Sequence, residues 1–170
     1  MYKKEKGFSL IELLIVVVII GIIAAIAIPN LLASRRSANE GAAISAMRTL
    51  HGAQQTYAST YGNGNYAGDI GAGTTTALAD LGTPNLIDSV LASATKSGYN
   101  FVGGRVARSA TQAAQFFFSA NPATTSGVTQ TGARRFGIAT DGVLMADPDP
   151  ANLGTAFDQT TIATATPLSN

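Results

Sequence analysis

Several residue types that support common protein chemistries are missing or scarce in this 170-residue chain. It has no cysteine, which excludes disulfides, thiolate metal sites and cysteine catalysis. It has no tryptophan and one histidine, so a histidine-based acid–base enzyme has little to work with. Charged residues make up 12% of the chain and the formal net charge is +1, which argues against a strongly basic nucleic-acid-binding protein. The length suits one folded domain.

One N-terminal segment is almost free of charged residues. No residue from Leu13 to Ile28 is polar, and Glu12 is the only charged residue between Phe8 and Ile28. As a helix, 8–28 would span about 31 Å, which matches the hydrocarbon thickness of a bilayer. The segment is longer than the apolar part of a cleaved secretory signal peptide. It predicts a transmembrane helix, and the lysines before it place the N-terminus in the cytoplasm and the rest outside.

Glu12 is the unusual residue of this segment, because a carboxylate inside a membrane is costly. It lies one turn inside the cytoplasmic end, so its side chain could simply reach the interface. Alternatively, it awaits a positively charged partner. A cut between Gly7 and Phe8 would create such a partner, an α-amino group one helical turn away from the carboxylate.

The run Gly-Phe-Ser-Leu-Ile-Glu-Leu-Leu-Ile-Val-Val at 7–17 resembles the signal segment of type IV pilins and the related pseudopilins. In that family a prepilin peptidase cuts after a glycine and N-methylates the new terminal phenylalanine. The resemblance implies cleavage between Gly7 and Phe8 and methylation of Phe8. The family carries a glutamate at the position of Glu12, where we expect it to act in assembly by neutralising the amino group of a neighbouring subunit.

The resemblance and the residue pattern together divide the chain into four parts. Gly21 and Pro29 match a glycine and a proline in the family's helix, and we expect a kink there. The parts are a cleaved leader at 1–7, a membrane and filament-core half of the helix at 8–29, an amphipathic half at 30–61, and a globular head at 62–170.

The amphipathic half carries apolar residues at spacings near three and four, which predicts one buried stripe facing the head. Its members are Leu31, Leu32, Ile44, Met47, Leu50, Tyr57 and Tyr61. Glu40 is expected to pair on the helix surface with Arg35 and Arg36. Gly62 and the Asn-Gly-Asn that follows should end the helix.

The head pattern predicts an antiparallel sheet, and hence an α+β fold with a long N-terminal helix. Residues 62–83 suggest a loop, and Thr83-Pro84 suggests the start of a short helix that ends near Gly98. Hairpin turns are expected at Gly103-Gly104 and at Asp141-Gly142. A strand at 115–120 would alternate the phenylalanines at 116–118 between core and surface, and the tail from Asp147 would be an extended strap.

Candidate chemical sites are few. His51 has no acid near it on the helix and suits a surface or core edge. Asp147, Asp149 and Asp158 could supply oxygen ligands to calcium, but their spacing is not that of an EF-hand. The four arginines of the head could form a basic patch, but charges guarding a solvated sheet edge explain them better. They are Arg105, Arg108, Arg134 and Arg135.

These features favour a structural subunit and not an enzyme, with no catalytic residue, no cofactor, no firm metal site and no specific nucleic-acid partner expected. The resemblance implies a type IV pilus subunit that is held in the inner membrane before it assembles into an extracellular filament. Its partners would be copies of itself, the prepilin peptidase, the assembly platform and its ATPase motor. The alternatives are a pseudopilin of a type II secretion system and a single-pass membrane-anchored binding module.

Overall fold

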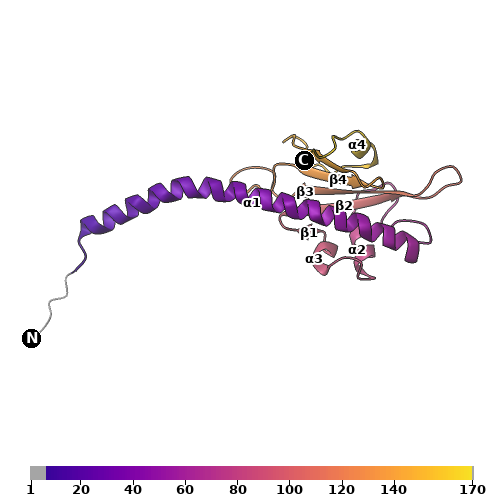
Figure 1. The fold of residues 1–170 in the computed structure, drawn as a ribbon, viewed down its shortest axis with the longest axis horizontal. Helices are drawn as coiled ribbons and strands as arrows, with labels where there is room; N and C mark the ends of the chain where they lie inside the picture. The colour runs from indigo at the N-terminus through magenta and orange to yellow at the C-terminus, as the bar shows by residue number, and fades with distance from the viewer. Residues whose placement is uncertain (1–6, 170) are drawn as a thin grey trace, which may run out of the picture. The chain divides into compact units, whose positions relative to one another are not determined.

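The computed structural model describes residues 7–169, so most of the expected leader lies outside the described residues. The described chain divides between Arg35 and Arg36 into two compact units, each treated by itself below. Figure 1 shows the elements along the chain. They are α1 (Leu10–Thr60), α2 (Thr76–Gly82), α3 (Ser89–Ala92), β1 (Thr95–Lys96), β2 (Tyr99–Val106), β3 (Gln115–Pro122), β4 (Arg135–Ala139), β5 (Leu144–Asp147) and α4 (Gln159–Ala163).

The first unit consists mainly of the apolar part of α1. The large apolar side chains from Leu10 to Leu31 are between 49% and 80% exposed. Within the described residues, α1 is the one helix long and apolar enough to cross a membrane. The helix continues through Gly21 and Pro29, although Pro29 has no N–H to donate to the preceding turn. The kink at these residues therefore stays a prediction.

The second unit contains a five-stranded antiparallel sheet in the order β1-β2-β3-β4-β5, which confirms the predicted α+β class. The later half of α1 packs against one face of this sheet. Met47 and Leu50 of α1 are fully buried in the same cluster as Phe101, Phe118 and Phe136 of the strands. The inner part of the predicted stripe is thus confirmed, whereas Leu31 and Tyr61 at its two ends are 68% and 56% exposed, so the prediction was wrong for them. The helix ends at Thr60, where Tyr57 O accepts hydrogen bonds from the next two backbone N–H groups.

The opposite face of the sheet is covered by the C-terminal tail. Phe117 points to this side and packs with Met145, Phe157 and Ile162. Its neighbours Phe116 and Phe118 belong to the cluster on the α1 side, and all three rings are fully buried. The predicted alternation between core and surface was wrong, because the tail turns the expected outer face into a second core. The tail is not a plain strap either, since it contains α4.

Two predictions between α1 and the sheet were also wrong. The segment 62–83 is not all loop, because α2 occupies its end and buries Leu78 and Leu81. Thr83 and Pro84 follow α2 and do not start the next helix. Asn85 adopts a positive φ of 57°, and Asp88 caps α3 by accepting a hydrogen bond from the Leu91 N–H at 3.0 Å. The expected helix is therefore a single turn with a different cap.

The two predicted hairpin turns had different outcomes. The turn at Asp141-Gly142 is confirmed, because it joins the antiparallel strands β4 and β5. Gly103-Gly104 is not a turn but lies inside β2, where side chains do not fit. A Cβ on Gly103 would overlap the Phe118 ring, and one on Gly104 would overlap the carbonyl oxygen of Ala72. The real turn before β2 lies at 97–98, where both residues have positive φ.

Both edges of the sheet carry additional backbone pairings. Next to the outer edge of β2, Thr74 and Gly103 exchange two backbone hydrogen bonds of 2.9 and 2.8 Å. At the far edge, the Ala146 N–H of β5 donates to Thr166 O at 3.0 Å and Leu168 N–H donates to Leu144 O at 2.8 Å. Loop and tail segments therefore cover donors and acceptors that the edge strands would otherwise expose.

Candidate functional site

The candidate processing site lies just outside the start of α1. Gly7, Phe8 and Ser9 precede the helix, and the Phe8 side chain is 83% exposed. Ser9 occupies the position before the first helical residue, and its hydroxyl oxygen accepts from the Ile11 N–H at 3.3 Å. The predicted scissile bond between Gly7 and Phe8 therefore belongs to a non-helical, exposed stretch.

The Glu12 side chain also caps the first turn of α1, by bonding back to the backbone of Ser9. Its Oε2 atom accepts a hydrogen bond from the Ser9 backbone N–H at 2.8 Å. Ser9 and Glu12 thus form a reciprocal cap, with an acid at the helix end where the helix dipole favours negative charge. This capping role was not among the predictions for Glu12, although a Ser-x-x-Glu spacing before an apolar run is typical of such a cap.

The capping geometry fixes the Glu12 carboxylate one residue away from the nitrogen that cleavage would release. Oε2 contacts the N–H of Ser9, and the Phe8 nitrogen precedes it by one residue in the chain. A free α-amino group at Phe8 would carry a positive charge near this end. The arrangement can therefore both start the helix in the uncut chain and bind an ammonium group in a cut one.

A second group of polar residues fastens α1 to the head. Glu40 is 8% exposed, and its Oε2 accepts from Arg134 Nε at 3.0 Å and Nη2 at 2.8 Å. Its Oε1 accepts from the Ala133 N–H at 2.8 Å. The predicted surface pairing of Glu40 with Arg35 and Arg36 was wrong. The head offers a bidentate arginine and a backbone donor that the helix surface cannot match.

Arg36 and Asn39 extend this attachment by one turn of α1. Arg36 donates from Nε to Gln130 O and from Nη2 to Gly127 O, both at 3.2 Å. Asn39 Nδ2 donates to Thr131 O at 2.9 Å. These bonds satisfy backbone carbonyls of the loop between β3 and β4, which lie outside the sheet. Arg36, Asn39 and Glu40 together therefore attach this loop to the helix.

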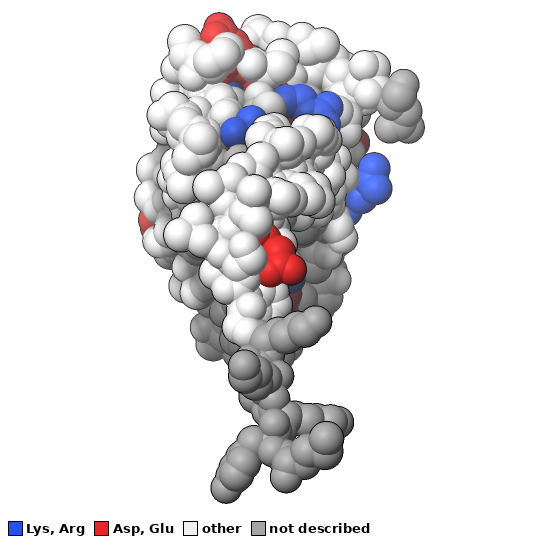
Figure 2. Space-filling view, turned by 90° about the vertical axis from the view of Figure 1, so that its left-hand side faces the viewer, with Lys and Arg blue, Asp and Glu red and all other residues white. Residues whose placement is uncertain are grey.

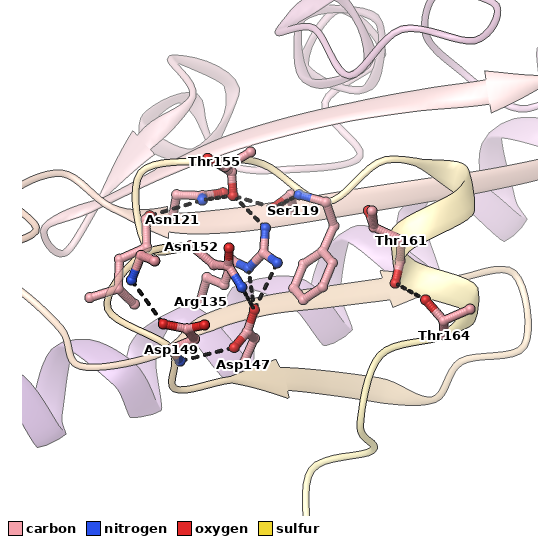
Figure 3. Close-up of polar contacts among 12 residues, drawn as sticks. Ser119, Asn121, Arg135, Asp147, Asp149, Asn152, Thr155, Thr161 and Thr164 are labelled. Carbon is pink, nitrogen blue, oxygen red and sulfur yellow. Dashed lines mark hydrogen bonds and ion pairs between the residues drawn. The ribbon is translucent and has the colours of Figure 1, made fainter.

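A third group, the C-terminal clasp, holds the tail by hydrogen bonds and an ion pair. It comprises Ser119, Asn121, Arg135, Asp147, Asn152 and Thr155 (Figure 3). Figure 3 shows Arg135 at its centre. Arg135 Nε and Nη2 donate to Asp147 Oδ2 at 2.9 and 2.7 Å, and Nη1 donates to Thr155 O at 2.7 Å. The guanidinium also lies over the Phe157 ring at 4.0 Å from its centroid. A single arginine therefore links β4, β5 and two parts of the tail.

Two buried side chains of β3 complete the clasp. Asn121 Nδ2 donates to the carbonyls of Leu153 and Thr155, the first at 3.0 Å and the second at 2.6 Å. Ser119 Oγ donates to Asn121 Oδ1 at 2.7 Å and accepts from the Phe157 N–H at 2.9 Å. Buried polar groups are costly without partners, and here each of the two side chains is paired.

The calcium candidates are engaged in other contacts. Asp147 accepts from Arg135, from Asn152 Nδ2 at 2.9 Å and from the Asp149 N–H at 2.9 Å. Asp158 caps α4 by accepting from the Thr160 and Thr161 N–H groups. Among the described residues, no group of three or more acidic, histidine or cysteine side chains could hold a metal ion. Calcium binding at Asp147, Asp149 and Asp158 therefore stays a hypothesis.

Hydrogen bonding lowers the pKa of both the Asp147 and the Asp158 carboxyl group. Burial alone would raise the pKa of Asp147, but hydrogen bonds from Asp149, Arg135 and Asn152 outweigh it and hold that pKa below its usual value. The backbone and hydroxyl of Thr161 lower the pKa of Asp158 in the same direction. Both groups are therefore charged at neutral pH and favour the folded state.

Two of the four arginines do not contribute to a basic patch, because Arg134 forms an ion pair with Glu40 and Arg135 forms one with Asp147. Arg105 lies in β2, where its Nε donates to Gly68 O at 2.7 Å, and Arg108 is exposed. On the face seen in Figure 2, charged side chains are few and scattered among uncharged ones. His51 lies at the core edge as expected, with Nε2 at 3.4 Å from Thr140 O and its ring beside Phe116.

Comparisons with known proteins bear on the N-terminal segment first. The family model described as the prokaryotic N-terminal methylation motif matches residues 2–28. The chain is 36% identical over 105 residues to the type IV wide pilus major component PilA4 of Thermus thermophilus. That match covers 60% of this chain and 75% of the relative.

Two further relatives match over shorter stretches. The type IV major pilin protein PilA of Myxococcus xanthus is 41% identical over 69 residues, which is 40% of this chain and 31% of the relative. Type II secretion system core protein G of Escherichia coli is 37% identical over 54 residues, 32% of this chain and 37% of the relative. No solved structure matches the chain significantly.

Proposed function

The chain belongs to the type IV pilin family, and from this premise we propose that it is the structural subunit of a type IV pilus. In this proposal a prepilin peptidase cuts after Gly7 and N-methylates Phe8. The mature chain then polymerises into a helical extracellular filament that serves motility, adhesion or DNA uptake. The head carries no part of this chemistry and supplies the outer surface.

The observation that carries the proposal is the unburied apolar surface of α1. Every large apolar side chain from Leu10 to Leu31 is at least 49% exposed in the single chain, around the whole helix. Such a helix must be covered by lipid or by other copies of itself. The inner membrane would cover it before assembly, with the N-terminus in the cytoplasm, and a bundle of the same helices would cover it in the filament.

Glu12 would give this bundle its register. Before cleavage its carboxylate is bound to the Ser9 N–H at 2.8 Å. After cleavage the ammonium group of Phe8 becomes available, on the same chain or on a neighbour. An unpaired carboxylate in an apolar bundle is strongly unfavourable, and pairing with an ammonium group reduces that cost. A subunit would therefore be held where its Glu12 meets a neighbouring Phe8.

A pseudopilin of a type II secretion system is the second candidate function. The matches to core protein G favour it, and they cover 32% of this chain in the Escherichia coli relative. The match to the Thermus thermophilus pilus component is longer, at 60% of the chain, and favours the pilus. The two functions share the processing chemistry and differ in whether long surface filaments form.

The test combines mass spectrometry of the mature subunit with electron microscopy of sheared surface filaments. The wild-type chain should begin with N-methylated Phe8 and form filaments. Gly7→Val should leave the precursor uncut. Glu12→Ala should be cut but remain in the membrane without filaments, whereas Glu5→Gln, which alters only the leader, should behave as wild type.

Three outcomes would contradict parts of the proposal. An intact Met1 on the wild-type subunit would support a membrane-anchored binding module. Normal filaments from Glu12→Ala would contradict the role of that carboxylate. A correctly processed wild-type subunit that forms no surface filament but is required for protein secretion would favour the pseudopilin.

A further inference from the structure

One surface feature of the second unit is used neither by the proposed assembly segment nor by the clasp. Tyr61 is 56% exposed, and among residues 36–169 it is the one aromatic side chain that lies open to solvent. It follows Tyr57 by one turn at the end of α1. The two ring centroids are 6.0 Å apart with an interplanar angle of 35°. The rings thus form a continuous aromatic wall.

This wall faces a groove of about 380 Å³ whose other sides come from the end of α2. Asp80, Thr83 and Pro84 line it together with the two tyrosines. We call these five residues the tyrosine groove. Its size falls within the range of small-molecule sites, and its combination of aromatic faces with a few polar atoms is typical of them.

Two side chains of the tyrosine groove, Asp80 and Thr83, can accept hydrogen bonds from a ligand. Asp80 Oδ2 accepts from the Gly68 N–H at 3.0 Å, which leaves the other oxygen of the carboxylate unused. Thr83 Oγ1 donates its hydrogen to Ala79 O at 3.1 Å, so toward a ligand this oxygen can act only as an acceptor. No lysine, arginine or histidine lines the groove, and Asp80 forms no ion pair within residues 7–169.

The chemistry of this lining selects the charge of the ligand. A carboxylate without a basic neighbour repels anions, including phosphate esters, and attracts cations. Tyrosine faces add attraction for an ammonium group because of the negative potential over the ring, and they lose little water when a weakly hydrated, alkylated ammonium covers them. A metal ion would find too few ligands here.

We propose that the tyrosine groove binds a substituted ammonium group on a ligand that is otherwise neutral. Tyr57 and Tyr61 provide the aromatic faces, and Asp80 provides the counter-charge. The proposal does not rest on cleavage or on filament assembly, because the five residues lie outside the segment from Gly7 to Leu31 on which those proposals depend. It would give the outer part of the subunit a selective small-molecule contact.

Choline and its neutral isostere 3,3-dimethyl-1-butanol are the two probes that test this. The full chain, labelled with ¹³C-tyrosine, is held in maltoside micelles in phosphate buffer, so that neither detergent nor buffer carries an ammonium group. Choline should shift the ring signals of Tyr57 and Tyr61 in a saturable way. The isostere should not, and the signals of Tyr66 and Tyr99 serve as internal references in the same spectra.

Three variants separate the contributions to binding. Tyr61→Leu and Asp80→Asn should each weaken choline binding by roughly three- to tenfold, which is the range for one cation–π or charge contact. Tyr61→Phe keeps the aromatic face and should bind choline within about twofold of wild type. Unchanged Tyr99 signals, from a ring buried in the core, show that each variant is folded.

The proposal is overturned if choline leaves Tyr57 and Tyr61 unshifted, or if the neutral isostere shifts them as strongly. It is also overturned if Tyr61→Leu binds choline as tightly as wild type. Loss of filaments in the Glu12 variant with choline binding retained would show that the two functions are separate.

Discussion

The carboxylate of Glu40 in α1 and the guanidinium of Arg134 next to β4 form a bidentate ion pair across 94 residues of sequence. Both nitrogens that donate lie within 3.0 Å of the same oxygen, and the other oxygen is occupied by the Ala133 N–H. This pair joins the helix to the sheet where the apolar stripe gives way to polar residues. Together with the bonds of Arg36 and Asn39 and the buried Met47 and Leu50, it holds the head along the later half of α1.

Removing either member of the Glu40 and Arg134 pair should destabilise the head. Because the Glu40 side chain is only 10% exposed, its carboxylate would lose its partner without regaining full hydration, whereas the Arg134 side chain is 38% exposed and would remain partly hydrated. We expect a coupling free energy of about 1–3 kcal/mol from a double-mutant cycle of Glu40→Ala and Arg134→Ala. It is measured by denaturant unfolding of the full chain in micelles.

The exposed pair of Asp88 and Lys96 provides a matched control. Its nitrogen–oxygen distance is 2.9 Å, but its side chains are 49% and 34% exposed. The same cycle on this pair should give about 0.5 kcal/mol or less. Equal coupling energies for the two pairs would mean that burial does not decide their strength.

Acid should weaken the C-terminal clasp through Asp147. Hydrogen bonds and the Arg135 charge hold the pKa of Asp147 below its unfolded value. The stabilisation is therefore present above the unfolded pKa of about 4 and is lost as the pH falls through the lower, folded pKa. Unfolding free energies of wild type and Asp147→Asn, measured from pH 7 downward, should converge in strong acid.

Arg135→Met should cost more than the acid titration of Asp147 alone, because it also removes the bond to Thr155 O and the contact with Phe157. We expect a loss of about 3 kcal/mol at neutral pH. Limited proteolysis should then cut the tail after Asp147 before the sheet. Arg105→Met, which removes one bond to Gly68 O, is the control and should leave the tail protected.

Phe117 should be the residue of β3 that holds the tail. Phe117→Ala empties the core on the tail side of the sheet, whereas Phe118→Ala empties the core on the α1 side. Each should cost about 3–5 kcal/mol. Hydrogen exchange of the full chain should distinguish them, with α4 losing protection first in Phe117→Ala and the later turns of α1 in Phe118→Ala. Identical exchange patterns would contradict two separate cores.

Substitutions of two glycines, Gly104 in β2 and Gly41 in α1, test how closely neighbouring backbone approaches β2. Gly104→Ala should destabilise the head because a Cβ would overlap the carbonyl oxygen of Ala72, which is fixed backbone. Gly41→Ala has open space and sits within α1, so it should stabilise the monomer by about 0.5–1 kcal/mol. The melting temperatures of the two variants should shift in opposite directions.

The parts of the fold that local residues specify were predictable. The apolar run, the stripe of α1 and the Asp141-Gly142 turn all depend on residues within a few positions of each other. The turn predicted at Gly103-Gly104 was wrong because glycine occurs both in turns and in strands that other groups approach closely. Here Phe118 and Ala72 lie so close to β2 that a side chain at either position would not fit, and this closeness depends on the tertiary structure. The surface pairing predicted for Glu40 was wrong because its actual partner, Arg134, lies 94 residues away in the sequence.

The candidate site divides in the same way. Gly7, Phe8 and Glu12 follow one short motif, so the sequence suggested them together. The Ser9 cap also follows from a local pattern, the Ser-x-x-Glu spacing of Ser9 and Glu12 before an apolar run. The clasp around Arg135 could not be inferred, because it depends on how β3, β4 and the tail meet.

The covered edges of the sheet have a consequence for a protein that must polymerise. Sheets with open edges add strands from other copies, and the product is an uncontrolled aggregate. Here Thr74 pairs with Gly103 on one side, and Thr166 and Leu168 pair with β5 on the other. The chain thus blocks one route of self-association and leaves the exposed apolar helix as the other. At the high local concentration of subunits in an assembling fibre, the covered edges therefore favour assembly through the helix over aggregation through the sheet.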